Sequence, residues 1–232
     1  TCNAPEGKYY KFESSPISDG TEMTIANDPT IEVIYTTDAY TGVKEVGEAV
    51  TDVKHLKNGH CYLVYDASDA DNGARKGYRR VVADTKQVNR FTSESQLDPS
   101  AVWTLEGEGN KFKVKNAYYD LYIPLLQRSA CPAVSKLGDT FTFTLNADGE
   151  SFKIAGTNGM MWDGNENGNM VGWDKGNGHP MKLYHFTAQP FFMLTLNGVT
   201  ADGEKLQTVA NLHAAGERYP LIIPVIRGYK LK

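Results

Sequence analysis

The sequence predicts an all-β protein, on three observations. Apolar and polar residues alternate only in short stretches, which Gly, Asn or Asp interrupts about every 8–12 residues, as in sandwiches and barrels. Helical periodicity is weak, and only residues 44–57 and 93–100 are expected to form a helical turn or two. The chain is also rich in turn-forming and aromatic residues, with 22 Gly and 13 Tyr among 232 residues.

An internal repeat divides residues 53–188 into three units. Aromatic residues recur at a shift of 40 residues, in these pairs: Trp103 and Phe143, Phe112 and Phe152, and Tyr122 and Trp162. Tyr62 precedes the first pair and Tyr184 follows the last. Three units of about four strands predict a β-trefoil, because a propeller usually needs at least four blades and a solenoid has shorter repeats. Its core is expected to contain a threefold set: Trp103, Phe143 and Tyr184.

The segments on either side of the repeat are expected to be β-rich and to lie outside the trefoil. Residues 1–52 form an N-terminal flank, and residues 189–232 form a C-terminal segment. Because the ends of a trefoil lie close together, the two flanks are expected to pack on each other as a small second domain. The expected strands are residues 22–26, 30–36, 191–196, 205–212 and 219–223.

The order of residues within each unit resembles that of ricin-B-type β-trefoil lectin modules. The shared pattern is aromatic-x-Leu, a Gly turn, aromatic-x-aliphatic, an Asn or Gly turn, and an aromatic residue. It is most similar to divergent modules in large secreted or cell-surface bacterial proteins. This resemblance implies a non-catalytic carbohydrate-binding module whose partner is a glycan or a cell-surface polysaccharide. The lectin motif Gln-x-Trp is reduced to Ala101-Val102-Trp103, so the alternative is a trefoil scaffold or protein-interaction domain without a sugar site.

Composition and motifs argue against several other functions. The net charge of −4 disfavours nucleic-acid binding, which usually needs a basic surface. No apolar run approaches the roughly 18 residues of a transmembrane helix. The sequence contains no HExxH, GxSxG or Cys–His signature, so an enzyme is not expected.

The two ends of the sequence carry expectations about its context. Cys2, directly after Thr1, fits a trimmed lipoprotein tether, so the protein is expected to be secreted or on the cell surface, with a lipid anchor as one option. Residues 216–229 are similar to part of the small β modules of bacterial adhesins. The chain is therefore expected to be a monomeric piece of a longer multidomain protein. The three cysteines, which show no metal-ligand spacing, are expected to be free thiols.

The candidate carbohydrate site lies in the third unit. Trp173 has no counterpart in the repeat and stands among turn residues and charges. An indole can stack on the apolar face of a sugar while carboxylates and amides bind its hydroxyl groups. Asp163, Asn165 and Asp174 are the expected hydroxyl partners. The alternative is a Trp173 that only packs against its own loop.

A second carbohydrate candidate lies in the preceding unit. It consists of Tyr118, Tyr119 and Asp120, in the matching turn before Tyr122.

Residues 163–169 match the start of a calcium loop, D-x-N-x-N-G. Asp163, Asn165 and Asn167 take positions 1, 3 and 5, and Asp174 stands at position 12, where such a loop has Glu. The alternative is a hairpin turn rich in Asn and Gly. No other cofactor is expected.

Overall fold

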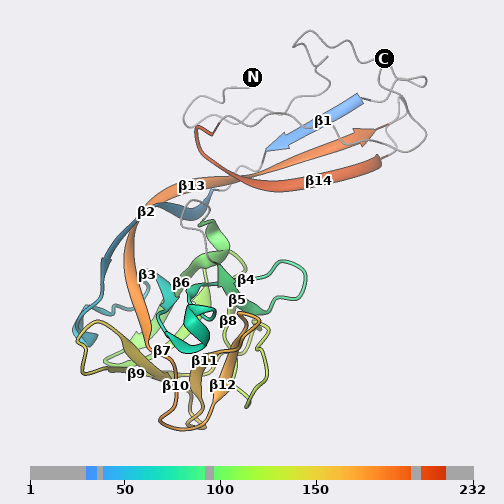
Figure 1. Cartoon of the computed structure of the whole chain (residues 1–232). Helices are drawn as coiled ribbons and strands as arrows, with labels where there is room; N and C mark the ends of the chain where they lie inside the picture. The colour runs from blue at the N-terminus through green and yellow to red at the C-terminus, as the bar shows by residue number, and fades with distance from the viewer. Residues whose placement is uncertain (1–29, 36–38, 92–96, 200–204, 218–232) are drawn as a thin grey trace. The chain divides into compact units, whose positions relative to one another are not determined.

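The computed structural model describes residues 30–35, 39–91, 97–199 and 205–217 (Figure 1). The chain divides into two compact units. The larger unit is Tyr40–Gln189, and the smaller one combines Thr1–Ala39 with Pro190–Lys232. Within the described residues there are strands and short 3-10 turns but no α-helix, so the predicted all-β class is confirmed.

The strands of the larger unit are β2 (Tyr40–Ala49), β3 (Cys61–Asp66), β4 (Gly77–Val81), β5 (Val88–Phe91), β6 (Val102–Glu108), β7 (Lys111–Asn116), β8 (Leu121–Tyr122), β9 (Phe141–Leu145), β10 (Phe152–Ala155), β11 (Met161–Gly164), β12 (Met170–Trp173) and the first part of β13 (Met181–Val199). Its 3-10 turns are η1 (Val53–His55), η2 (Ala70–Gly73) and η4 (Pro99–Ala101).

Six of these strands close into a ring. Hydrogen-bonded antiparallel pairs join β3 to β6, β6 to β7, β7 to β9, β9 to β10, β10 to β13, and β13 back to β3. Closure leaves none of the six with a bare edge, which removes the template for unwanted strand pairing. The ring is therefore a barrel.

Large apolar side chains fill the barrel at equivalent places in three strand pairs. The facing residues are Tyr62 and Trp103 in β3–β6, Phe112 and Phe141 in β7–β9, and Phe152 and Met181 in β10–β13. All six are fully buried. A second buried set consists of Leu105, Phe143 and Leu183. Each lies two residues after the second member of one of these pairs.

The expected core set of Trp103, Phe143 and Tyr184 needs correction. Trp103 and Phe143 are buried in the main core. The residue that faces Phe112, as Trp103 faces Tyr62, is however Phe141. Tyr184 is only half-buried and packs against a separate cluster around Leu63 and Tyr78. Successive residues of a strand point to opposite faces, so Leu183 takes the inward position and Tyr184 cannot.

The expected helical turns also need correction. Residues 44–49 belong to strand β2, and only the 3-10 turn η1 follows, capped by the Asp52 side chain, which accepts from the Lys54 N–H at 2.8 Å. Of residues 93–100, Pro99 and Ser100 begin η4, Asp98 caps it, and residues 93–96 lie outside the described part.

Hairpins extend from the barrel strands. The strands β4 and β5 form one hairpin, and β11 and β12 form another. After β8, an isolated bridge joins Tyr122 to Ser135. Figure 1 shows these elements in the lower part of the view.

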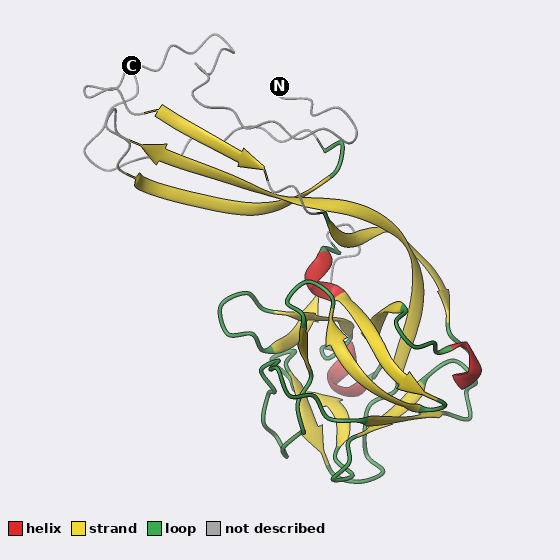
Figure 2. Ribbon diagram, turned by 180° about the vertical axis from the view of Figure 1, so that it is seen from behind, coloured by secondary structure: helices red, strands yellow, loops and turns green. Residues whose placement is uncertain are grey.

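The smaller unit holds a three-stranded antiparallel sheet in its described residues (Figure 2). Its central strand is the second part of β13, which pairs with β1 (Thr30–Tyr35) on one side and β14 (Lys205–Ala214) on the other. N-terminal and C-terminal segments thus share one sheet. Expected strands at residues 22–26 and 219–223, the tether residue Cys2 and most of residues 216–229 lie outside the described residues.

Two further findings concern the described residues. Cys61 and Cys131 are free thiols. No helix in the described ranges is long and apolar enough to cross a membrane.

Candidate functional site

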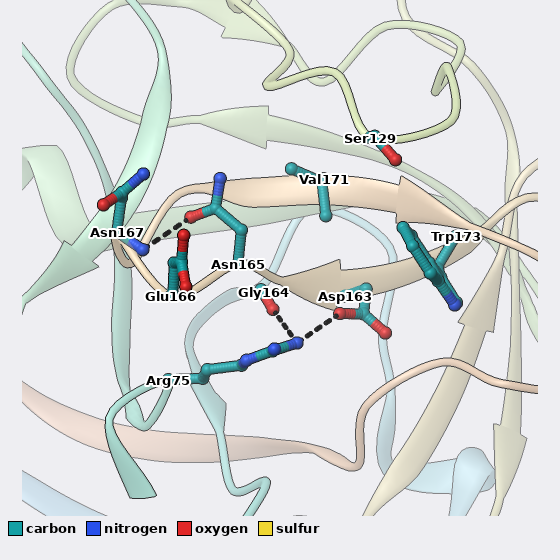
Figure 3. Close-up of a pocket in the computed structure, with 9 residues that line it drawn as sticks. All are labelled: Arg75, Ser129, Asp163, Gly164, Asn165, Glu166, Asn167, Val171 and Trp173. Carbon is teal, nitrogen blue, oxygen red and sulfur yellow. Dashed lines mark hydrogen bonds and ion pairs between the residues drawn. The ribbon is translucent and has the colours of Figure 1, made fainter. Parts of the chain in front are cut away.

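The hairpin β11–β12 forms one wall of a pocket of about 380 Å³ (Figure 3). Its strands pair from Met161 opposite Trp173 to Gly164 opposite Met170. Side chains of the two strands and of the turn between them face the pocket together with two residues from other segments. The lining consists of Arg75, Ser129, Asp163, Gly164, Asn165, Glu166, Asn167, Val171 and Trp173. The sequence-predicted residues Asp163, Asn165 and Trp173 therefore meet in one place.

Asp163 is a buried carboxylate that lies close to one arginine and one histidine. Its Oδ1 lies 3.7 Å from Arg75 Nη1 and 3.1 Å from His179 Nε2. Arg75 Nη1 also donates to the Gly164 carbonyl at 2.8 Å. Burial raises the pKa of Asp163, and the nearby His179 and Arg75 oppose that rise. The pocket thus has one carboxylate that its neighbours hold in place.

Behind Asp163, an ion-pair network continues into the interior. His179 Nδ1 lies 2.8 Å from Asp66 Oδ2, and the fully buried Asp66 pairs with the fully buried Arg79. Burial lowers the pKa of Arg79, and Asp66 opposes that shift. Buried charges need such partners, because an isolated one would lose its hydration without compensation.

Gly164 makes room for this network. A Cβ atom at this position would lie 2.5 Å from Arg79 Nη2 and 2.8 Å from Asp66 Oδ2. The sequence analysis did not predict Asp66, Arg79 or His179 as site residues. Asp66 lies 13 positions from Arg79 and 113 positions from His179, so no short motif joins the three. The local signal in the sequence was a pair of adjacent arginines in strand β4, of which Arg79 is buried and Arg80 half-buried.

Trp173 is half-buried at one end of the pocket, and an arginine from another loop covers part of it. The guanidinium carbon of Arg128 lies 4.9 Å from the centre of the indole. The same guanidinium donates to both carboxylate oxygens of Asp174, from Nε at 2.9 Å and from Nη2 at 3.0 Å. The structure therefore places Asp174 beside Trp173 but outside the pocket lining, in a two-point contact with Arg128.

The expected calcium ligands do not converge. Asn165 Oδ1 accepts the N–H groups of Asn167 and Asn169, at 3.0 Å each, which is the hydrogen bonding of a hairpin turn. Asp163 faces His179, and Asp174 faces Arg128. Among the described residues, no group of three or more His, Cys, Asp or Glu side chains could hold a metal ion. Calcium binding by residues 163–174 stays a prediction of the sequence alone.

The second predicted carbohydrate candidate lies in a cluster of three tyrosines, Tyr40, Tyr118 and Tyr119. The ring of Tyr118 meets those of Tyr40 and Tyr119 edge to face, with centroids 4.7 and 4.6 Å apart. Both Tyr118 and Tyr119 are half-buried, and burial raises their pKa values. Asp120 is exposed and pairs with Lys115 at 3.1 Å. The three rings thus form one contiguous aromatic cluster, which joins the start of β2 to the turn before β8.

The side chains that line the pocket at β11–β12 suit a small polar ligand with one apolar face. The indole of Trp173 offers a stacking surface, and amide and carboxylate groups of Asp163, Asn165 and Glu166 offer hydrogen-bonding partners at the other walls (Figure 3). Its volume falls at the lower end of the roughly 300–1,000 Å³ typical of small-molecule sites.

Comparison with protein-family models gave no match, and comparison with curated protein sequences gave none. Among solved structures, the chain is similar to a lectin of Polyporus squamosus in complex with a human-type influenza-binding epitope, Neu5Aca2-6Galb1-4GlcNAc. The TM-score is 0.44 at 17% sequence identity. The match covers 58% of this chain and 50% of the lectin chain, so the chain corresponds to about half of that protein's length.

Proposed function

We propose that the larger unit is a β-trefoil that binds glycans without catalysis. The closed ring of six strands supports the trefoil, as do the three equivalent buried pairs that Tyr62, Phe112 and Phe152 make. A trefoil of this kind consists of a six-stranded barrel with a hairpin in each of three units. The hairpins β4–β5 and β11–β12 fit two of those places.

The observation that carries the proposed function is the meeting of Trp173 with Asp163 and Asn165 in one pocket. A sugar ring has an apolar face of C–H groups and a rim of hydroxyls. The indole stacks on the first, and the carboxylate and amide bind the second. Neither kind of group alone would distinguish a sugar from water or from a purely apolar ligand.

The affinity is expected to be weak, in the millimolar to micromolar range. A single small pocket buries little ligand area, and sugar hydroxyls exchange bonds with water for bonds with protein at little net gain. Multiple copies of such a module, or a multivalent glycan, would raise the effective affinity.

A glycan array probed with the labelled chain and with the variant Trp173→Ala tests this proposal. The wild-type chain should bind at least one glycan, and the variant should lose that binding by at least about tenfold, because it lacks the stacking surface. The midpoint of thermal unfolding should fall only slightly, since the indole lies at the edge of the fold.

Phe91→Ala provides a matched control. Phe91 is also half-buried with an arginine over its ring, Arg80 at 4.6 Å, but it lies on the hairpin β4–β5 and does not line this pocket. Its replacement should leave glycan binding unchanged. Absence of binding to the whole array, or equal binding by wild type and Trp173→Ala, would overturn the proposed site. Loss of binding with Tyr118→Ala instead would move the site to the tyrosine cluster.

The second candidate function is that of a scaffold or protein-interaction domain without a sugar site. The contact of Arg128 with Trp173 and Asp174 favours this second function. Arg128 gives a partner within the protein to two of the four side chains that were predicted to bind sugar at this site. An empty glycan array together with an intact fold would support this reading.

The wider setting belongs to the same proposal. A glycan-binding module fits a secreted or cell-surface bacterial protein, with a lipid anchor on Cys2 as one option. Detection of a lipid on Cys2 by mass spectrometry of the natural protein would support that setting. An unmodified Cys2 in the mature protein would remove the anchor from it.

A further inference from the structure

We propose that Arg128 and Asp174 are positioning residues that hold the Trp173 ring in its binding orientation. This inference rests on the proposed glycan site, since it assigns the pair its role in that site. It also changes the role of Asp174, which the sequence analysis expected to bind sugar hydroxyls directly.

The first support is the geometry around the indole. Arg128 lies over the ring of Trp173, whereas Trp173 lines the pocket and Arg128 does not. The arginine thus covers one face of the ring without being part of the pocket lining. A planar guanidinium can stack on an aromatic ring and at the same time bind a carboxylate through two N–H groups, which an ammonium cannot do.

The second support is that Asp174 fixes the guanidinium. Its two oxygens accept from Nε and Nη2 of Arg128 in a forked arrangement, at 2.9 and 3.0 Å. The side chains of Arg128 and Asp174 are 58% and 48% exposed. A single exposed ion pair adds little stability, so the fork is better explained by orientation than by folding energy.

The third support is the way the Arg128 loop is attached. The Ser129 N–H donates to the Gly172 carbonyl at 2.8 Å, and Arg128 forms an isolated parallel bridge with Gly172. The loop is thus bound to the residue directly before Trp173. Its backbone has little freedom to carry the guanidinium away from the ring.

Fixing the ring in advance lowers the entropy lost when a ligand binds. Without Arg128, Trp173 would sample other rotamers, and the stacking surface would be present for only part of the time. The apparent affinity falls by the fraction of time for which the competent orientation is populated.

Two measurements on Arg128→Ala test the inference in the whole chain. Affinity for the glycan found on the array should fall by about three- to tenfold, as the populated fraction of the competent orientation falls. Acrylamide should also quench the tryptophan fluorescence more strongly. Trp103 and Trp162 are 0% and 1% exposed, so the change in quenching reports on Trp173.

Companion variants separate positioning from general damage. Asp174→Ala and the double variant Arg128→Ala/Asp174→Ala should bind no more weakly than Arg128→Ala, because Asp174 acts through Arg128. Arg128→Lys keeps the charge but not the fork, and should recover only part of the affinity. Arg80→Ala removes an arginine from another aromatic ring, that of Phe91, and should alter neither readout.

Unchanged quenching in Arg128→Ala would overturn the inference whether or not a glycan is found. Equal glycan affinity of wild type and Arg128→Ala would overturn it as well. If no glycan binds and Arg128→Ala still increases the quenching, the proposed glycan-binding function is overturned instead. Arg128 and Asp174 would then only order the Trp173 ring.

Discussion

At the scale of single residues, Glu106 has two hydrogen-bonding partners. Glu106 accepts from the ammonium group of Lys115 at 2.7 Å and from the hydroxyl group of Tyr122 at 2.8 Å. These two hydrogen bonds lower the pKa of Glu106 from its ordinary value of 4.5. The ionised carboxylate is therefore more favourable in the folded chain than in the unfolded one.

The variant Glu106→Gln should change how stability depends on pH. A lowered folded-state pKa gives stability that is present above the unfolded pKa and is lost as pH falls through the folded pKa. The wild-type advantage over the variant should thus be full at neutral pH and shrink below pH 4.5. Because the pair is partly exposed, solvent screening limits the difference to about 1 kcal/mol or less.

Urea unfolding of both chains over a series of pH values measures this difference. Glu150→Gln is a suitable control, since Glu150 pairs with a single lysine, Lys182, at an exposed position. A difference between wild type and Glu106→Gln that stays constant on acidification would contradict the assignment.

At the scale of elements, the close approach of strand β12 to the loop that carries Arg128 organises the candidate site. Gly172 permits it, because a Cβ atom there would lie 2.6 Å from the Gln127 carbonyl oxygen and 3.0 Å from the Leu126 Cβ. Any larger residue has to push that backbone away. The glycine is thus a packing requirement rather than a turn residue.

Gly172→Ala should displace the loop and destabilise the fold by about 1–3 kcal/mol, as overpacking does. It should also increase acrylamide quenching of Trp173, since Arg128 moves with the loop. Gly109→Ala serves as the control. Gly109 has φ +62° and open space around it, so alanine there strains the backbone without displacing a neighbour. Equal quenching in wild type and Gly172→Ala would show that the loop does not hold the ring.

The order of the elements also explains which core predictions succeeded. The 40-residue shift relates Phe112 to Phe152, and in the strand register each of them faces a buried residue of another strand, Phe141 and Met181 respectively. Trp103 faces Tyr62, and the residue that faces Phe112 is Phe141, two residues before the predicted Phe143. Phe143 is two residues beyond Phe141, and an even shift keeps the inward face, so the predicted residue was still buried. Tyr184 is three residues beyond Met181, the member of the third pair, and an odd shift moves it to the other face.

At the scale of the whole molecule, apolar periodicity and turn spacing were sufficient to predict the all-β class. The closing pair between β3 and β13 joins residues more than a hundred positions apart, and no local pattern reports such a contact. The same holds for the site. The sequence could place Asp163, Asn165 and Trp173 on one hairpin, but not the arrival of Arg75 and Arg128 from other segments.

The central claim is that Trp173 forms the stacking surface of a glycan site, and its indole N–H signal tests this most directly. In a ¹H–¹⁵N correlation spectrum, the three tryptophans give three separate indole signals. Trp103 Nε1 donates to the Arg79 carbonyl inside the core, and Trp162 is 1% exposed, so both serve as internal controls. Titration with the glycan found on the array should shift the Trp173 signal alone. A Trp173 signal that stays in place while the glycan binds, or a shift confined to the two buried tryptophans, would contradict the account.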